Sequence, residues 1–126
     1  MQPSDLPRHQ LIRTLTAQHP EKVADAAIGL WEQVAAQIIS IVGEGGFNAL
    51  YARSVFLTQS NFPWLEERAP PQTEHRFAKL KTSLAGQTPE QASAANNLLL
   101  ITFTDIVATL IGEQMTNTIL RSAWGQ

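Results

Sequence analysis

The sequence lacks cysteine, and only three of its 126 residues are histidine. The lack of cysteine excludes disulfide scaffolds, thiolate zinc sites and cysteine nucleophiles, and it suits a reducing compartment. Residues 1–13 lack the basic start and apolar run of a secretory signal peptide. The formal net charge of −2 argues against a dedicated nucleic-acid binder. We therefore expect a cytoplasmic protein that binds no nucleic acid.

The segments between the proline and glycine breaks lack sustained apolar–polar alternation, which marks half-buried strands. Their apolar residues recur instead at helical spacing, over residues 4–18, 21–42, 46–60, 73–84 and 89–124. The chain length fits one domain that buries its own core. We predict a single all-α domain over residues 1–126, a bundle of about five or six helices. The two long helices, 21–42 and Pro89–Ile111, are expected to lie at its centre.

Three helix ends are predicted from single residues. Ser4 fits the N-cap of the first helix, and Thr88 fits the N-cap of the last stretch, with Pro89 at its first helical position. Gly43 fits a C-terminal cap in the left-handed conformation, which costs glycine little.

An internal repeat emerges when the chain is shifted by 69 residues against itself. Gly43-Glu44 then falls on Gly112-Glu113, Pro20-Glu21 falls on Pro89-Glu90, and the apolar positions pair without a gap. Two amphipathic helices of similar length also match by coincidence, so this alternative stays open. We interpret residues 20–54 and 89–123 as two helix–(Gly-Glu)–helix units, with each glutamate in a first helical turn, where the helix dipole stabilises its charge.

The stretch from Pro89 to Leu120 contains no lysine or arginine. A helix that is apolar nearly all round is buried, either at the centre of a bundle or in a subunit interface. We therefore expect a homo-oligomer, specifically a dimer. A membrane span is not expected, because the apolar run 98–111 is shorter than the ~20 residues that a bilayer needs and Asp105 lies within it.

Groups that could carry catalysis are few. The three histidines do not share a helical face, and the His-Glu-x-x-His and Glu-x-x-His motifs of metal sites are missing, so no metal or other cofactor is expected. His75, with Lys79 one turn away, is a candidate phosphotransfer site, but its spacing and short helix do not fit one. Glu44 and Glu113 could meet as a carboxylate pair, or serve only as helix-start charges. We expect no enzymatic activity.

Aromatic residues near element ends are candidates for partner contact. Phe62, Trp64 and Trp124 lie there, and tryptophan is enriched in interface hot spots. The alternative is that the Phe62-Pro63-Trp64 loop plugs the end of the bundle. Phe103, with Trp31, could instead line an apolar ligand cavity.

Asp105 stands out because it interrupts an otherwise apolar helix. A buried carboxylate needs hydrogen bonds or a cation, so we expect Asp105 to be at least partly buried against a threonine hydroxyl or a distant arginine. If it has no partner, Asp105→Leu is expected to stabilise the fold.

These observations predict a non-catalytic protein-interaction or regulatory module that self-associates. The Gly-Glu corner is similar to that of small helical domains that accompany bacterial signalling proteins, and this resemblance implies a signalling protein as a further partner. The alternative is a small-molecule sensor or carrier with an apolar cavity in the bundle.

Overall fold

The computed structural model of the chain describes residues 7–16, 23–65 and 77–124. These ranges contain helices and no strand, which confirms the predicted all-α class. The helices are α1 (Pro7–Thr16), α2 (Val23–Thr58), α3 (Ala78–Ala85), α4 (Pro89–Ile111) and α5 (Glu113–Trp124).

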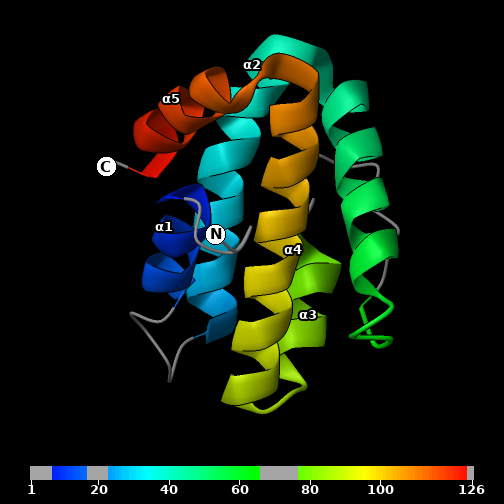
Figure 1. Ribbon diagram of the computed structural model, residues 1–126. Helices are drawn as coiled ribbons and strands as arrows, with labels where there is room; N and C mark the ends of the chain where they lie inside the picture. Colours follow the sequence, from blue (N-terminus) through cyan, green and yellow to red (C-terminus); the bar gives the residue numbers. More distant parts are fainter. Residues whose placement is uncertain (1–6, 17–22, 66–76, 125–126) are drawn as a thin grey trace.

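The first half of α2 and all of α4 form the centre of the bundle and run in the same direction (Figure 1). The second half of α2 descends on one side of this pair, and α5 descends on the other. α1 and α3 pack against both central helices. The predicted central position of the two long helices is therefore confirmed.

The Gly43 corner differs from the prediction. α2 is two helical segments joined at Gly43, whose φ of 81° is paired with an extended ψ of 168° rather than with the left-handed value expected for a cap. Gly112 has nearly the same conformation, with φ 96° and ψ 152°. This region is reached almost only by glycine. Both glycines need this conformation because the next helix begins at the following residue, so one residue makes the whole change of direction.

The remaining helix ends follow the sequence to within a few residues. Thr88 caps α4 as predicted, since its hydroxyl oxygen accepts a hydrogen bond from the Gln91 amide at 3.2 Å. The segments predicted at 21–42 and 46–60 are continuous apart from the Gly43 kink. Helix 73–84 is described only from Ala78 onward, and Ser4 lies outside the described residues.

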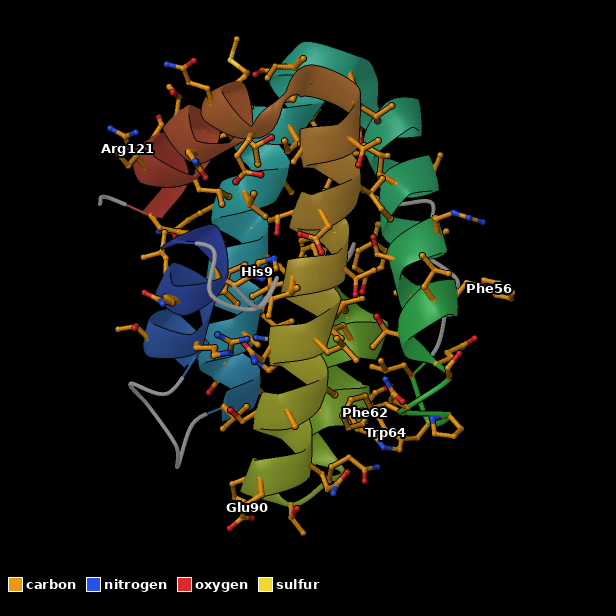
Figure 2. The ribbon with its side chains drawn as sticks, in the orientation of Figure 1. His9, Phe56, Phe62, Trp64, Glu90 and Arg121 are labelled. Carbon is orange, nitrogen blue, oxygen red and sulfur yellow. The ribbon has the colours of Figure 1, made fainter. Side chains whose placement is uncertain are left out.

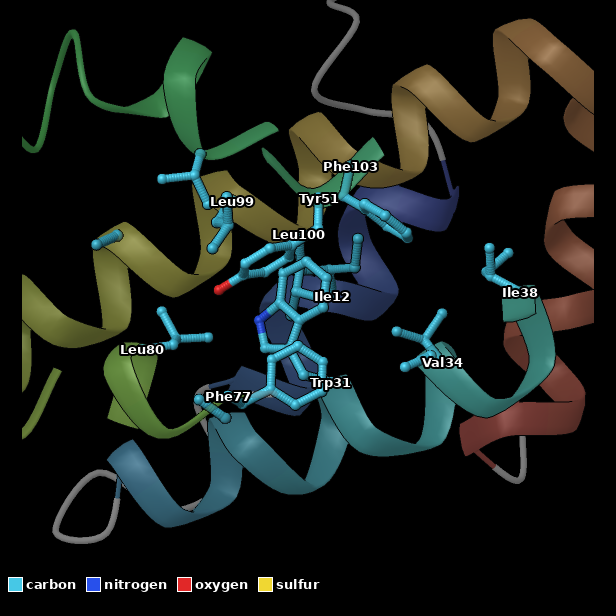
Figure 3. Packing of buried hydrophobic residues seen from close by; sticks show 14 of the residues in the cluster. Ile12, Trp31, Val34, Ile38, Tyr51, Phe77, Leu80, Leu99, Leu100 and Phe103 are labelled. Atoms are coloured by element: carbon cyan, nitrogen blue, oxygen red, sulfur yellow. The ribbon is translucent and has the colours of Figure 1, made fainter. Parts of the chain in front are cut away.

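An aromatic cluster forms the middle of the core (Figure 3). Trp31 packs edge-on against Tyr51 and Phe103, with ring centroids 5.3 and 5.2 Å away. Phe47 and Phe77 complete the cluster. The indole Nε1 of Trp31 donates a buried hydrogen bond of 2.9 Å to Asn96 Oδ1, so α2 and α4 share a polar contact inside the apolar core.

The pattern of buried residues is repeated when the chain is shifted by 69 residues. Nine buried positions of α2 fall on buried positions of α4 or α5: Val23/Ala92, Ala27/Asn96, Trp31/Leu100, Val34/Phe103, Ala35/Thr104, Ile38/Val107, Phe47/Thr116, Tyr51/Leu120 and Val55/Trp124. Together with the two glycine corners, this pattern fits a duplicated unit, which stays our interpretation of the repeat.

α2 and α4 are each long and apolar enough to cross a membrane, judged by length and composition. This is weak evidence, because the core helix of a soluble protein passes the same test. Both helices here pack against several other helices, and α2 bends at Gly43.

Candidate functional site

Both Gly-Glu corners lie at the same end of the bundle, where α4 turns into α5 and the two segments of α2 meet (Figure 1). Large apolar side chains are exposed beside each corner. Their exposed fractions are 51% for Ile41, 37% for Val42, 62% for Leu110 and 52% for Met115. We call these four side chains the corner surface.

The helical register explains why the corner surface is exposed. Ile38 and Val107 are the last fully buried residues before the two corners. Beyond them the chain turns at the corners, and Ile41 and Leu110, each three residues further on, are mainly exposed. These two residues occupy equivalent positions in the repeat. Full burial of such a side chain is worth about 1.5–3 kcal/mol, and roughly half of that is still to be gained at Ile41 and Leu110.

Two acidic residues stand next to the corner surface in the sequence. Glu44 and Glu113 are exposed and follow the corner glycines directly. Residues 26–52 and 82–120 contain no lysine or arginine. Each glutamate lies in the first turn of a helix, as predicted, where the amide dipoles stabilise its carboxylate. Both also make contacts within the chain.

Among the described residues, no group of three His, Cys, Asp or Glu side chains could hold a metal ion. His75, the candidate phosphotransfer residue, lies outside the described residues.

Asp105 has a partner that the sequence did not suggest. His9 of α1 is buried, and its Nε2 lies 2.8 Å from Asp105 Oδ1 on α4. Figure 2 shows His9 facing the centre of the bundle beside α4. Asp105 itself is half-buried, with 48% of its side chain exposed. Thr109 contributes a hydroxyl bond to the main-chain oxygen of Asp105 rather than to its carboxylate. The pair fastens α1 to α4.

The aromatic candidates occupy different environments. Phe62 and Trp64 are partly buried and pack against the core. Their rings contact each other edge-on, with centroids 5.9 Å apart. Figure 2 shows both residues below the second half of α2. Trp124 is buried and donates its indole N–H to the Leu30 carbonyl at 3.0 Å, which ties α5 to α2. Phe103 is also fully buried. Trp124 and Phe103 are therefore core residues that a partner cannot reach in this fold.

The comparisons with known proteins are negative. No family model, curated protein or solved structure matches the chain.

Sequence reasoning missed the corner surface because Ile41 and Leu110 continue the apolar stripes of their helices, which are expected to face the core. One signal could have found it: in both units an apolar pair stands directly before Gly-Glu, Ile41-Val42 in the first and Leu110-Ile111 in the second. His9 and Asn96 were missed as polar partners because 96 and 65 residues separate them from Asp105 and Trp31.

Proposed function

We propose that the protein is a non-catalytic interaction module, a regulatory or signalling accessory, that docks a partner protein on the corner surface. One observation carries the proposal: of the six large apolar side chains that are exposed among the described residues, four lie beside the two equivalent corners at one end of the bundle. Exposed apolar groups that gather at one place mark interaction sites more often than scattered ones do.

The experiment compares partner capture by matched variants. Ile41→Ser/Leu110→Ser removes apolar area from the corner surface. Phe56→Ser/Leu57→Ser removes similar exposed area from the second half of α2, where Figure 2 shows Phe56 pointing away from the bundle. All four positions are exposed, so both variants are expected to keep the parent's helical circular dichroism and thermal midpoint.

A partner supports the proposal if it is held by the parent and by Phe56→Ser/Leu57→Ser but lost by Ile41→Ser/Leu110→Ser. The proposal is wrong if every specific partner is retained by the corner variant.

The sequence predicts self-association because Pro89–Ile111 has more apolar surface than a peripheral helix needs. Among the described residues, α4 contacts four other helices, and Leu110 is its only large apolar side chain that is mainly exposed. A second copy would cover Leu110 and the partly buried apolar side chains of this helix. Sedimentation equilibrium at high concentration tests for self-association, and a stable dimer would support the dimer expected from the sequence.

The alternative of a ligand carrier has less support. Trp31 and Phe103, the residues expected to line its cavity, are fully buried and pack directly against each other. We keep a cytoplasmic location as part of the proposal, on the ground that the chain lacks cysteine.

A further inference from the structure

We propose that α5 is an exchangeable arm through which two copies of this chain form a domain-swapped dimer. This inference does not depend on the docking surface proposed above. In the structure α5 turns back to pack beside α2 after a single non-helical residue, Gly112 (Figure 1). If Gly112 adopts helical angles instead, α4 and α5 become one straight helix over residues 89–124, and α5 leaves its own bundle.

The helical register requires a second copy once the corner is straight. Val107, the last buried residue of α4, and Thr116, the first buried residue of α5, are nine residues apart. At about 100° per residue they lie on opposite sides of a straight helix. The buried face of α5, which includes Ile119 and Leu120, would then point away from the core that α4 faces. A second copy offers the same surface of α2 and covers this face when the two copies exchange α5.

The bundle that α5 leaves keeps its aromatic core. The rings of the aromatic cluster belong to residues between Trp31 and Phe103, so none of them lies on α5. A straight helix at Gly43 would instead separate Trp31 from Tyr51, because these two residues lie on either side of that corner. Of the two corners, Gly112 is therefore the one at which exchange leaves the core intact.

The contacts that hold α5 against α2 are equally available in a second copy. Trp124 donates its indole N–H to the Leu30 carbonyl at 3.0 Å, and the other copy presents the same carbonyl. The amides of Gly112 and Thr116 already donate to the carbonyls four residues before them, as in an unbroken helix. Exchange therefore keeps the packing of α5 and rebuilds the backbone only between these two residues.

The residue at the hinge sets the balance between monomer and exchanged dimer. Glycine reaches the corner conformation without strain, so we expect the parent to be a monomer at low concentration. Gly112→Ala favours the straight helix and should lower the dissociation constant of the dimer at least about tenfold, because each dimer relieves two strained corners. Gly45→Ala is the same change at a helical position and should not lower it. Sedimentation equilibrium measures all three proteins.

Two further measurements separate an exchanged dimer from two bundles that touch side by side. Three glycines inserted after position 112 of the Gly112→Ala variant give α5 room to fold back, so this protein should return to a monomer. Glu90→Cys/Arg121→Cys places spin labels at two exposed positions of a chain without cysteine (Figure 2). In the Gly112→Ala dimer, diluted with unlabelled protein, we expect a label separation of about 47 Å along the straight helix. The separation in the monomer is shorter because α5 turns back at the corner.

The inference is overturned if Gly112→Ala is a folded monomer up to about 1 mM, if its dimer survives the glycine insertion, or if the label separation is the same in dimer and monomer. If Gly112→Ala does not fold, the parent decides the question. Refolded from urea at about 1 mM, the parent should yield a dimer with the long label separation. A parent that refolds only to a monomer under these conditions also overturns the inference.

Discussion

His9 and Asp105 lie 96 residues apart in the chain, and their side chains meet at 2.8 Å between α1 and α4. His9 is buried and Asp105 is half-buried, so the pair joins an interior imidazole to a carboxylate that keeps contact with water. The second ring nitrogen of His9, Nδ1, is buried without a hydrogen-bond partner among the described residues. The ring therefore depends on Asp105.

The first prediction concerns this pair. Asp105→Ala leaves a buried imidazole without its partner, and the free energy of unfolding should fall by about 1 kcal/mol, the lower range for such a loss because Asp105 is half-exposed. Asp105→Leu should lower the stability by a similar amount. The sequence predicted that this change would stabilise the fold only if Asp105 had no partner, and His9 is its partner. Urea unfolding of a double-mutant cycle with His9→Leu measures the coupling. Equal effects of Asp105→Ala in the parent and in His9→Leu would show that the contact contributes nothing.

The second prediction concerns the two corners. Gly43→Ala and Gly112→Ala place a Cβ on a backbone with φ of 81° and 96°, and each should lower the free energy of unfolding by about 1–3 kcal/mol. Thermal or urea unfolding measures the loss. The strain comes from the backbone alone, because a Cβ at either position would meet no atom within 4 Å.

Gly45→Ala is the matched control for the corners. Gly45 lies two residues beyond Gly43, in helical conformation, and a Cβ there would point into open space. Alanine at this position should raise stability by about 0.4–1 kcal/mol. A loss at Gly45 as large as at Gly43 would contradict the assignment of the strain to positive φ.

The third prediction concerns the buried bond from Trp31 to Asn96. Asn96→Leu leaves the indole N–H of Trp31 without an acceptor in the core, which should cost about 1–3 kcal/mol. Trp31→Phe removes the donor, so adding Asn96→Leu to it should cost less than in the parent. If Asn96→Leu is equally harmful in both backgrounds, Asn96 acts by its shape and not by this hydrogen bond.

The fourth prediction concerns alkaline pH. Burial raises the pKa of the Tyr51 hydroxyl above its usual range. Below about pH 10 the tyrosine is protonated in the folded and unfolded chains alike, and its contribution is fully present. Above that value the unfolded chain releases the proton first, so stability falls as the pH rises.

Tyr51 is the sole tyrosine, so its tyrosinate absorption can be followed directly. We expect that absorption to appear together with the loss of helical circular dichroism, and Tyr51→Phe to unfold at a higher pH than the parent. Titration of Tyr51 in the folded protein, well before unfolding, would contradict its burial.

The sequence predicted the fold class, the central helices and the Thr88 cap because each depends on local patterns: apolar periodicity, a hydroxyl before a proline, and glycine at a bend. The conformation of Gly43 was not predictable in the same way. A left-handed cap assumes that a loop follows the helix, whereas here Glu44 begins the next helix at once. The local sequence does not show in which direction that second helix leaves the corner.

The candidate site was predicted only in part. The Gly-Glu corners were identified from the repeat, but the exposure of Ile41 and Leu110 depends on where neighbouring helices end. Periodicity places an apolar residue on a face and does not show whether another helix reaches that level. Trp124 was misjudged for the converse reason, because its acceptor, the Leu30 carbonyl, lies 94 residues away.

Methyl NMR of the bound protein tests the docking surface most directly. The chain has two methionines, Met1 and Met115, so a methionine-methyl spectrum contains two signals, and Met115→Leu assigns the one on the corner surface. With a partner bound, we expect the signals of Met115, Ile41 and Leu110 to shift together while that of Leu57 stays in place. A bound partner that shifts Leu57 and leaves all three corner methyl groups unchanged would contradict the assignment of the corner surface as the docking site.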